Sequence, residues 1–151
     1  MRQGGCSFSL HERAFSQTPT DASASERAIR FSTGVNLSCP QRFTNKPSER
    51  VWDQLVRAGD STSNNLIEAD DASSDADFLS KMSIALREAK ESRAALMKIR
   101  LGQLDHHQEV AERELESEAG QLAAIYAAII RNMRLRLAEE ERLRRIRKRN
   151  S

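Results

Sequence analysis

Between residues 48 and 101, apolar side chains recur at steps of three and four, which places them on one face of an α-helix. The first run consists of Trp52, Leu55, Val56, Gly59, Ser63, Leu66 and Ile67. The second consists of Phe78, Met82, Ala85, Ala89, Ser92, Leu96 and Ile99. The joint between them, residues 70–75, has carboxylates and hydroxyls but no large apolar side chain. This pattern predicts a helical hairpin whose second arm packs nearly antiparallel to its neighbours.

The expected helix boundaries follow from capping residues. Pro47 and Ser48 suit the start of the first arm, and Asp75 suits the cap of the second, because its side-chain oxygen can accept from free backbone amides. A shorter helix is expected to begin near Ser25 or Glu26 and to end within a residue or two of Pro40.

A last helix is predicted from a third heptad pattern, formed by Leu115, Ala119, Leu122, Tyr126, Ile129 and Met133. Between Ala119 and Ile130 this helix is apolar on more than one face, which indicates a subunit interface. Leu135, Leu137, Leu143 and Ile146 allow the helix to continue. The expected fold is an all-α, antiparallel up-and-down four-helix bundle over residues 25–135, with a disordered leader at 1–24 and a basic helical extension at 136–151.

Charge is distributed unevenly along the chain. The net charge is +2, but residues 131–151 hold nine basic and three acidic side chains, so this segment carries +6 and the rest carries −4. The basic residues are Arg131, Arg134, Arg136, Arg142, Arg144, Arg145, Arg147, Lys148 and Arg149. Three interpretations are open: a solvated helix terminus that complements the helix dipole, an arm that contacts RNA or DNA phosphates, and attachment to a membrane surface. No aromatic residue interleaves with these cations, so any nucleic-acid binding is expected to be weakly sequence-specific.

A second, polar stripe lies along the first arm of the hairpin. Gln54, Ala58, Ser61, Asn65 and Glu68 follow steps of four and three. The stripe is either a solvated face or a polar seam at a helix or subunit contact, with Lys81, Arg87 and Arg93 as possible partners.

The sequence predicts no catalytic residue, no metal site and no cofactor. It lacks a phosphate-binding loop, a dinucleotide glycine fingerprint and a nucleophile motif. His106 and His107 are expected to be exposed loop residues, because adjacent histidines on a helix point about 100° apart. Cys6 and Cys39 lack a redox spacing, and the longest apolar run, Leu122–Ile130, is far short of the roughly 20 residues of a membrane span. These features favour a cytoplasmic protein without a membrane partner.

The hairpin also carries a family resemblance. Gln54-Leu55-x-Arg57-Ala58-x-x-Ser61-x-x-x-Asn65-Leu66-x-Glu68-Ala69, followed by Asp77-Phe78-Leu79 and Ile84-Ala85-x-x-Glu88-x-x-Glu91-Ser92, resembles the bacterial four-helix-bundle proteins of intervening sequences in 23S ribosomal RNA genes. A related branch serves as accessory protein to reverse transcriptases of diversity-generating retroelements. The resemblance covers roughly Glu26–Met133, and Ser63 and Ala69 depart from its usual proline and glycine. It implies a four-helix bundle, a homopentameric ring and no known catalytic activity.

Two functions follow as hypotheses. The first is a non-enzymatic oligomer that binds structured RNA, such as ribosomal RNA, through the basic C-terminal residues. The second is a protein-binding assembly adaptor, with a reverse transcriptase as one candidate partner and no direct contact to nucleic acid. The acidic charge of residues 1–130 mildly favours the second hypothesis.

Overall fold

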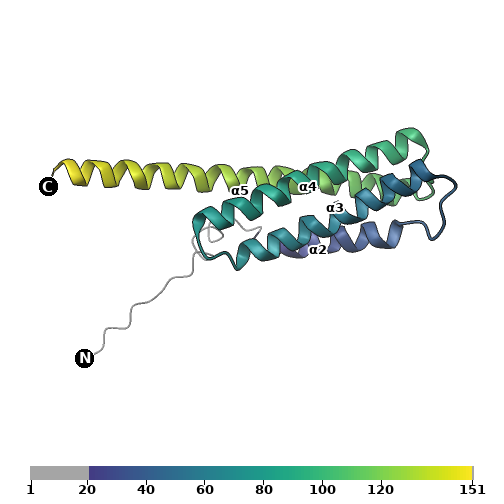
Figure 1. Ribbon diagram of the computed structural model, residues 1–151, viewed down its shortest axis with the longest axis horizontal. Helices are drawn as coiled ribbons and strands as arrows, with labels where there is room; N and C mark the ends of the chain where they lie inside the picture. The colour runs from purple at the N-terminus through teal and green to yellow at the C-terminus, as the bar shows by residue number, and fades with distance from the viewer. Residues whose placement is uncertain (1–20, 151) are drawn as a thin grey trace, which may run out of the picture.

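The computed structural model describes residues 21–150, which form four α-helices: α2 (Asp21–Ser38), α3 (Lys46–Asp70), α4 (Asp75–Gly102) and α5 (Glu109–Arg149). This described range contains no β-strand. Helices α2 and α4 each pack against both α3 and α5, and successive helices run in opposite directions (Figure 1). The expected all-α four-helix bundle is therefore confirmed for the single chain. The leader proposed at residues 1–24 lies outside the described residues, except for its last four.

The capping residues differ from those expected. Helix α3 is capped by Asn45, whose Oδ1 accepts from the Ser48 backbone amide at 2.9 Å. The helix starts at Lys46, so Pro47 lies in its first turn, where no intrahelical partner for its missing N–H is needed. Helix α4 is capped by Ser74, whose Oγ accepts from the Asp77 amide at 3.1 Å. Asp75 is instead the first helical residue, where its charge complements the helix dipole.

Helix α2 begins at Asp21, earlier than the expected start at Ser25 or Glu26. Ala24 is buried, and together with Ala28, Phe31 and Val35 it forms the face of α2 that meets the core. The earlier start adds about one helical turn and one more core contact. The helix ends at Ser38, two residues before Pro40, as predicted.

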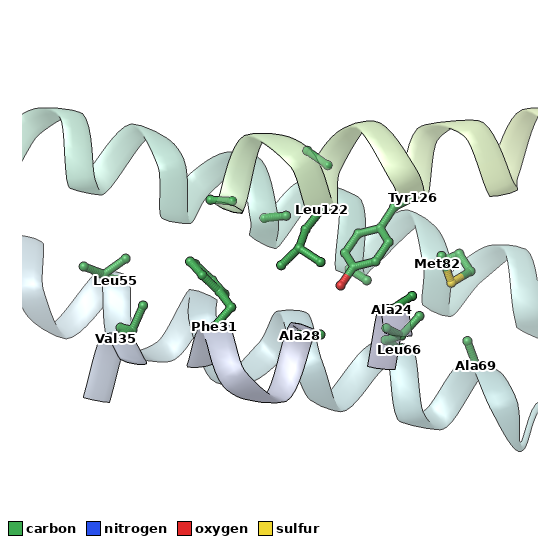
Figure 2. Packing of buried hydrophobic residues seen from close by; sticks show 14 of the residues in the cluster. Ala24, Ala28, Phe31, Val35, Leu55, Leu66, Ala69, Met82, Leu122 and Tyr126 are labelled. Carbon is green, nitrogen blue, oxygen red and sulfur yellow. The ribbon is translucent and has the colours of Figure 1, made fainter. Parts of the chain in front are cut away.

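The core lies along the bundle axis and is built from the predicted heptad positions. All seven positions of the second run are buried on α4, and Leu122 and Tyr126 of α5 meet Phe31 and Leu66 across the interior (Figure 2). Small residues on α4, Ala85 and Ala89, allow close helix packing. Ile67 departs from expectation, because 42% of it is exposed. Burial also raises the pKa of the Tyr126 phenol well above its ordinary value.

Polar links join all four pairs of neighbouring helices. Arg27 pairs with Glu118 between α2 and α5 at 2.7 Å, and Asn36 donates to Asp60 between α2 and α3 at 2.9 Å. The other two pairs of helices are joined by Glu68–Lys81, Arg100–Glu116 and Arg136–Asp75. Because these groups are partly exposed, each link contributes little energy and acts mainly on helix register.

The loop between α4 and α5 is tied to the rest of the bundle. The buried Trp52 of α3 donates from Nε1 to the Leu104 carbonyl at 2.9 Å. The Asp105 carboxylate accepts from the Thr44 amide at 3.0 Å, and this hydrogen bond lowers the pKa of Asp105. The loop thereby fixes where α5 enters the bundle.

The expectation that both loop histidines are exposed is wrong for His106. Its Nδ1 contacts the Glu112 carboxylate, and its side chain is only 11% exposed. Glu112 is buried and also accepts from the backbone amides of His107 and Gln108 at 3.3 and 3.2 Å. His107 stays exposed, with its ring centroid 6.2 Å from that of Trp52.

Candidate nucleic-acid interface

The basic C-terminal segment is a helical arm that projects from the bundle. Helix α5 has 41 residues and is about 60 Å long, and its last part extends past the ends of α2, α3 and α4 (Figure 1). Every residue from Glu141 to Asn150 is exposed. Six of the eight residues from Arg142 to Arg149 are basic, and steps of 100° per residue distribute them around the helix. Phosphates can therefore approach this arm from several directions.

Some of these cations are paired within the helix. Arg142 makes two hydrogen bonds to Glu139, both 2.9 Å, which raise the pKa of Arg142. Arg145 pairs with Glu141, which lies one helical turn earlier. Such exposed pairs are weak, each contributing ~0.3–0.5 kcal/mol, so a phosphate can compete for these guanidiniums.

Other cations in the arm and at its base are available without breaking a contact. Within residues 21–150, the side chains of Arg131, Arg134, Arg144, Lys148 and Arg149 form no ion pair or hydrogen bond. Arg136 is placed differently from the other predicted cations. Its side chain is 27% exposed and pairs with Asp75 and Glu140, both at 3.2 Å, so it fastens α5 to the start of α4.

The polar stripe of α3 faces the boundary with α4. Gln54, Ala58 and Ser61 line an open groove of about 530 Å³ together with Glu88 and Glu91. Asn65 donates to the Ser61 carbonyl within its own helix at 2.9 Å. Of the three possible cationic partners, Lys81 pairs with Glu68, whereas Arg87 pairs with Glu88 on its own helix. Arg93 lies on the opposite side of α4, beside α5.

The sequence did not single out a second group of arginines. Arg93 and Arg100 of α4 and Arg113 of α5 line one groove between these helices, together with Glu116. A signal was present, since Arg93 and Arg100 are seven residues apart and share a helix face. The sequence did not show the register of α5 against α4. This register brings Arg113 beside Arg93 and Arg100.

Other kinds of site find no support in the described part of the chain. Among residues 21–150, no group of three or more His, Cys, Asp or Glu side chains is arranged to hold a metal ion. No helix in that range is long and apolar enough to cross a membrane. Cys39 has a free thiol, and Cys6 lies outside the described residues.

Comparison with known proteins places the bundle in a family. A family model described as "23S rRNA-intervening sequence protein" matches residues 20–128, which is most of the chain. A search of curated proteins found no match. A solved structure, a protein of unknown function from the S23 ribosomal protein family of Bacteroides thetaiotaomicron VPI-5482, is 26% identical, with a TM-score of 0.57. The match covers 71% of this chain and 97% of that one.

The matched range separates the two groups of cations. Arg131 and all the basic residues after it lie beyond residue 128, whereas Arg93, Arg100 and Arg113 lie inside the matched range. The bundle, from α2 to the middle of α5, is the part that the family model describes. On this evidence, the chain belongs to the 23S rRNA-intervening sequence protein family.

Proposed function

We propose that this protein is a non-enzymatic oligomer that binds structured RNA, such as ribosomal RNA, through its basic helical arm. The observation that carries the proposal is the exposure of six basic residues within Arg142–Arg149 on a helix that projects beyond the bundle. Arg131 and Arg134 at the base of the arm extend the same charge. Because Arg136 is held by Asp75 and Glu140, we assign it to the attachment of α5 rather than to RNA.

Electrostatics supports phosphate contacts over base contacts. Clustered arginines neutralise phosphates and release counterions, which yields affinity without sequence readout. Residues 127–151 contain no aromatic residue, so the arm has no side chain for stacking on bases. We therefore expect binding that is weakly sequence-specific and strongly dependent on salt.

Oligomerisation would strengthen such weak contacts, because each subunit contributes an arm. The family resemblance suggests a homopentameric ring. Within the single chain, Ile125 and Ile129 of α5 remain only partly buried. This apolar surface supports a subunit contact along α5, and we propose the ring on that basis. A cytoplasmic location belongs to the same proposal.

The first test combines light scattering during size-exclusion chromatography with titration of a labelled structured RNA at about 50 and 200 mM salt. We expect a single ring-sized species whose RNA affinity falls steeply as salt rises. An oligomer that does not bind RNA at the lower salt concentration would contradict RNA binding. A monomer would contradict the ring.

A charge-reversal variant tests the arm itself. Changing Arg144, Arg145, Arg147 and Arg149 to Glu should abolish RNA binding and leave the oligomer intact, because these side chains lie outside the bundle. The matched control reverses four exposed cations of the bundle: Arg42, Arg50, Arg57 and Lys98. If both variants lose the same affinity, net charge rather than the arm accounts for binding.

One observation favours the protein-binding adaptor as a second candidate. Leu135, Leu143 and Ile146 are 64%, 42% and 44% exposed, although each is a large apolar side chain on the projecting part of α5. Exposed apolar groups of this kind are typical of protein contacts. Copurification of a partner that is released by Leu143→Ser with Ile146→Ser, but not by the arginine reversal, would support the adaptor over the RNA-binding protein.

A further inference from the structure

We infer that the groove between α4 and α5 is a second phosphate-binding site, aligned with the arm, so that one RNA contacts both. The inference rests on the proposed RNA binding and extends it to the wall of the bundle. The site consists of Arg93 and Arg100 of α4 and Arg113 of α5, with Ser117 and Gln121 as neutral hydrogen-bonding groups.

Charge distinguishes this groove from the other groove of the same volume. Each is about 530 Å³ and open to solvent. The α4–α5 groove is lined by three arginines and one carboxylate, Glu116, which gives its lining a charge of +2, or +1 when Glu109, the partner of Arg113, is counted. The lining of the α3–α4 groove has two arginines and three carboxylates, which gives it −1, or 0 when Arg87, the partner of Glu88, is counted. On a body whose residues 1–130 carry −4, the α4–α5 groove is a local positive site.

The arginines retain donors for an anion. Arg100 binds Glu116 through Nε and Nη2, and Arg113 binds Glu109 through the same two atoms. A guanidinium has five N–H donors, so Nη1 remains unused on each. The partly buried Arg100–Glu116 pair holds the Arg100 guanidinium in place, which lowers the entropy lost when an anion binds.

Arg93 supplies a cation without an internal partner. Within residues 21–150 its side chain forms no ion pair or hydrogen bond. It lies across Gly120 of α5, where a Cβ on the glycine would be 3.5 Å from Arg93 Nε. The Arg93 guanidinium therefore lies against the α5 backbone inside the groove.

Helix geometry aligns the groove with the arm. An α-helix of 3.6 residues per turn returns to the same angular position after 18 residues, because these make five turns. Arg113, Arg131 and Arg149 are separated by 18 residues each and therefore lie on the same side of α5. Arg131 and Arg149 are exposed, and α5 is one unbroken helix over this span (Figure 1). The line from Arg113 to Arg149 is about 54 Å long at 1.5 Å per residue.

The test compares two pairs of substitutions in the full chain, with a labelled RNA hairpin as the probe. Arg93→Gln with Arg113→Gln removes two cations from the groove and spares Arg100, whose pairing with Glu116 joins the helices. Arg50→Gln with Arg57→Gln is the control, because it removes the same charge from the α3–α4 groove. Both pairs are exposed, so the fold should persist, and circular dichroism and light scattering verify this.

We expect the groove pair to weaken RNA binding about tenfold and to reduce the slope of log affinity against log salt by about 1–2, as two lost phosphate contacts require. The control pair should leave the slope unchanged. Equal effects of the two pairs would overturn the inference. The inference would also be overturned if the groove pair lost binding to an oligoglutamate peptide but kept its affinity for RNA. The groove would then be a site for acidic protein segments.

The two proposals fail in different ways. If the arm reversal abolishes RNA binding and the groove pair has no effect, the groove is excluded and the proposed function stands. If the groove pair weakens binding and the arm reversal does not, the arm is excluded and the groove is the site. If no RNA binds the unaltered protein, both proposals fall.

Discussion

The buried carboxylate of Glu112 organises the loop that leads into α5. It receives contacts from the His106 ring and from the backbone amides of His107 and Gln108, at the point where α5 has free amide groups. A carboxylate near a helix N-terminus is favoured by the helix dipole and by amide donors. Gln108 makes no side-chain cap, so Glu112 performs that function from inside the helix.

Replacing Glu112 by Ala should therefore destabilise the protein by ~1–3 kcal/mol, because the partly buried donors of the loop lose their acceptor. Urea unfolding, followed by circular dichroism, measures the change. Glu114→Ala is the control: it removes the same side chain two residues later, at an exposed position. The control should stay within ~0.5 kcal/mol of the unaltered protein. Equal stability of the two variants would show that the Glu112 contacts contribute nothing.

At the scale of single helices, the apolar pattern determines which face is buried, whereas the capping residues determine where the helix begins. The three apolar runs predicted which faces of α3, α4 and α5 meet the core, apart from the exposed Ile67, since a helix with a regular apolar stripe can bury only that stripe. The exact ends depend on competition among adjacent polar residues. Asn45 and Ser74 cap their helices ahead of Ser48 and Asp75, and a linear sequence that offers several cap residues does not rank them.

Glycine within a helix provides a test at this scale. Gly59 is buried in the middle of α3, and a Cβ added there would meet Val35 at 3.6 Å, an ordinary contact distance. Gly59→Ala should stabilise the protein by ~0.5–1 kcal/mol, because alanine loses less backbone entropy in a helix.

Gly34→Ala serves as the comparison, because the added Cβ would lie 3.0 Å from Leu115 Cδ2 and the leucine must move. Urea unfolding of the two variants should place Gly59→Ala above Gly34→Ala in stability. The reverse order would mean that packing around Gly59 is tighter than the distance to Val35 indicates.

At the scale of the whole molecule, α5 lies in two environments, the bundle and the solvent. The first part of α5 packs in the bundle through residues such as Leu122, Tyr126 and Met133, whereas its end is exposed to solvent on all sides. The bundle is thus complete without the arm. This division predicts that stability and RNA binding are separable.

Two truncations test that separation. Among the described residues, a chain that stops after Ala138 loses only exposed or half-buried ones, so it should unfold within ~0.5 kcal/mol of the full chain while losing RNA affinity. A chain that stops after Ala128 also loses the buried Ile130 and Met133 and should be destabilised by at least ~2–5 kcal/mol. Urea unfolding and RNA titration measure both. A large loss of stability after Ala138 would show that the arm supports the bundle.

The sequence by itself determined the all-α class, the hairpin, the buried heptad positions and the basic arm, because each depends on residues close together in the chain. Helical period and local charge density are properties of such segments. The family resemblance was likewise carried by contiguous motifs, and the match over residues 20–128 confirmed it.

The tertiary structure decided what depends on register between helices. It placed His106 against Glu112, paired Arg136 with Asp75 and brought Arg113 beside Arg93 and Arg100. These pairings join different elements, and side-chain packing along the core sets the rotation and offset of each helix to within one turn. A pattern within one helix specifies which face is buried, but only packing selects the neighbours of the remaining faces.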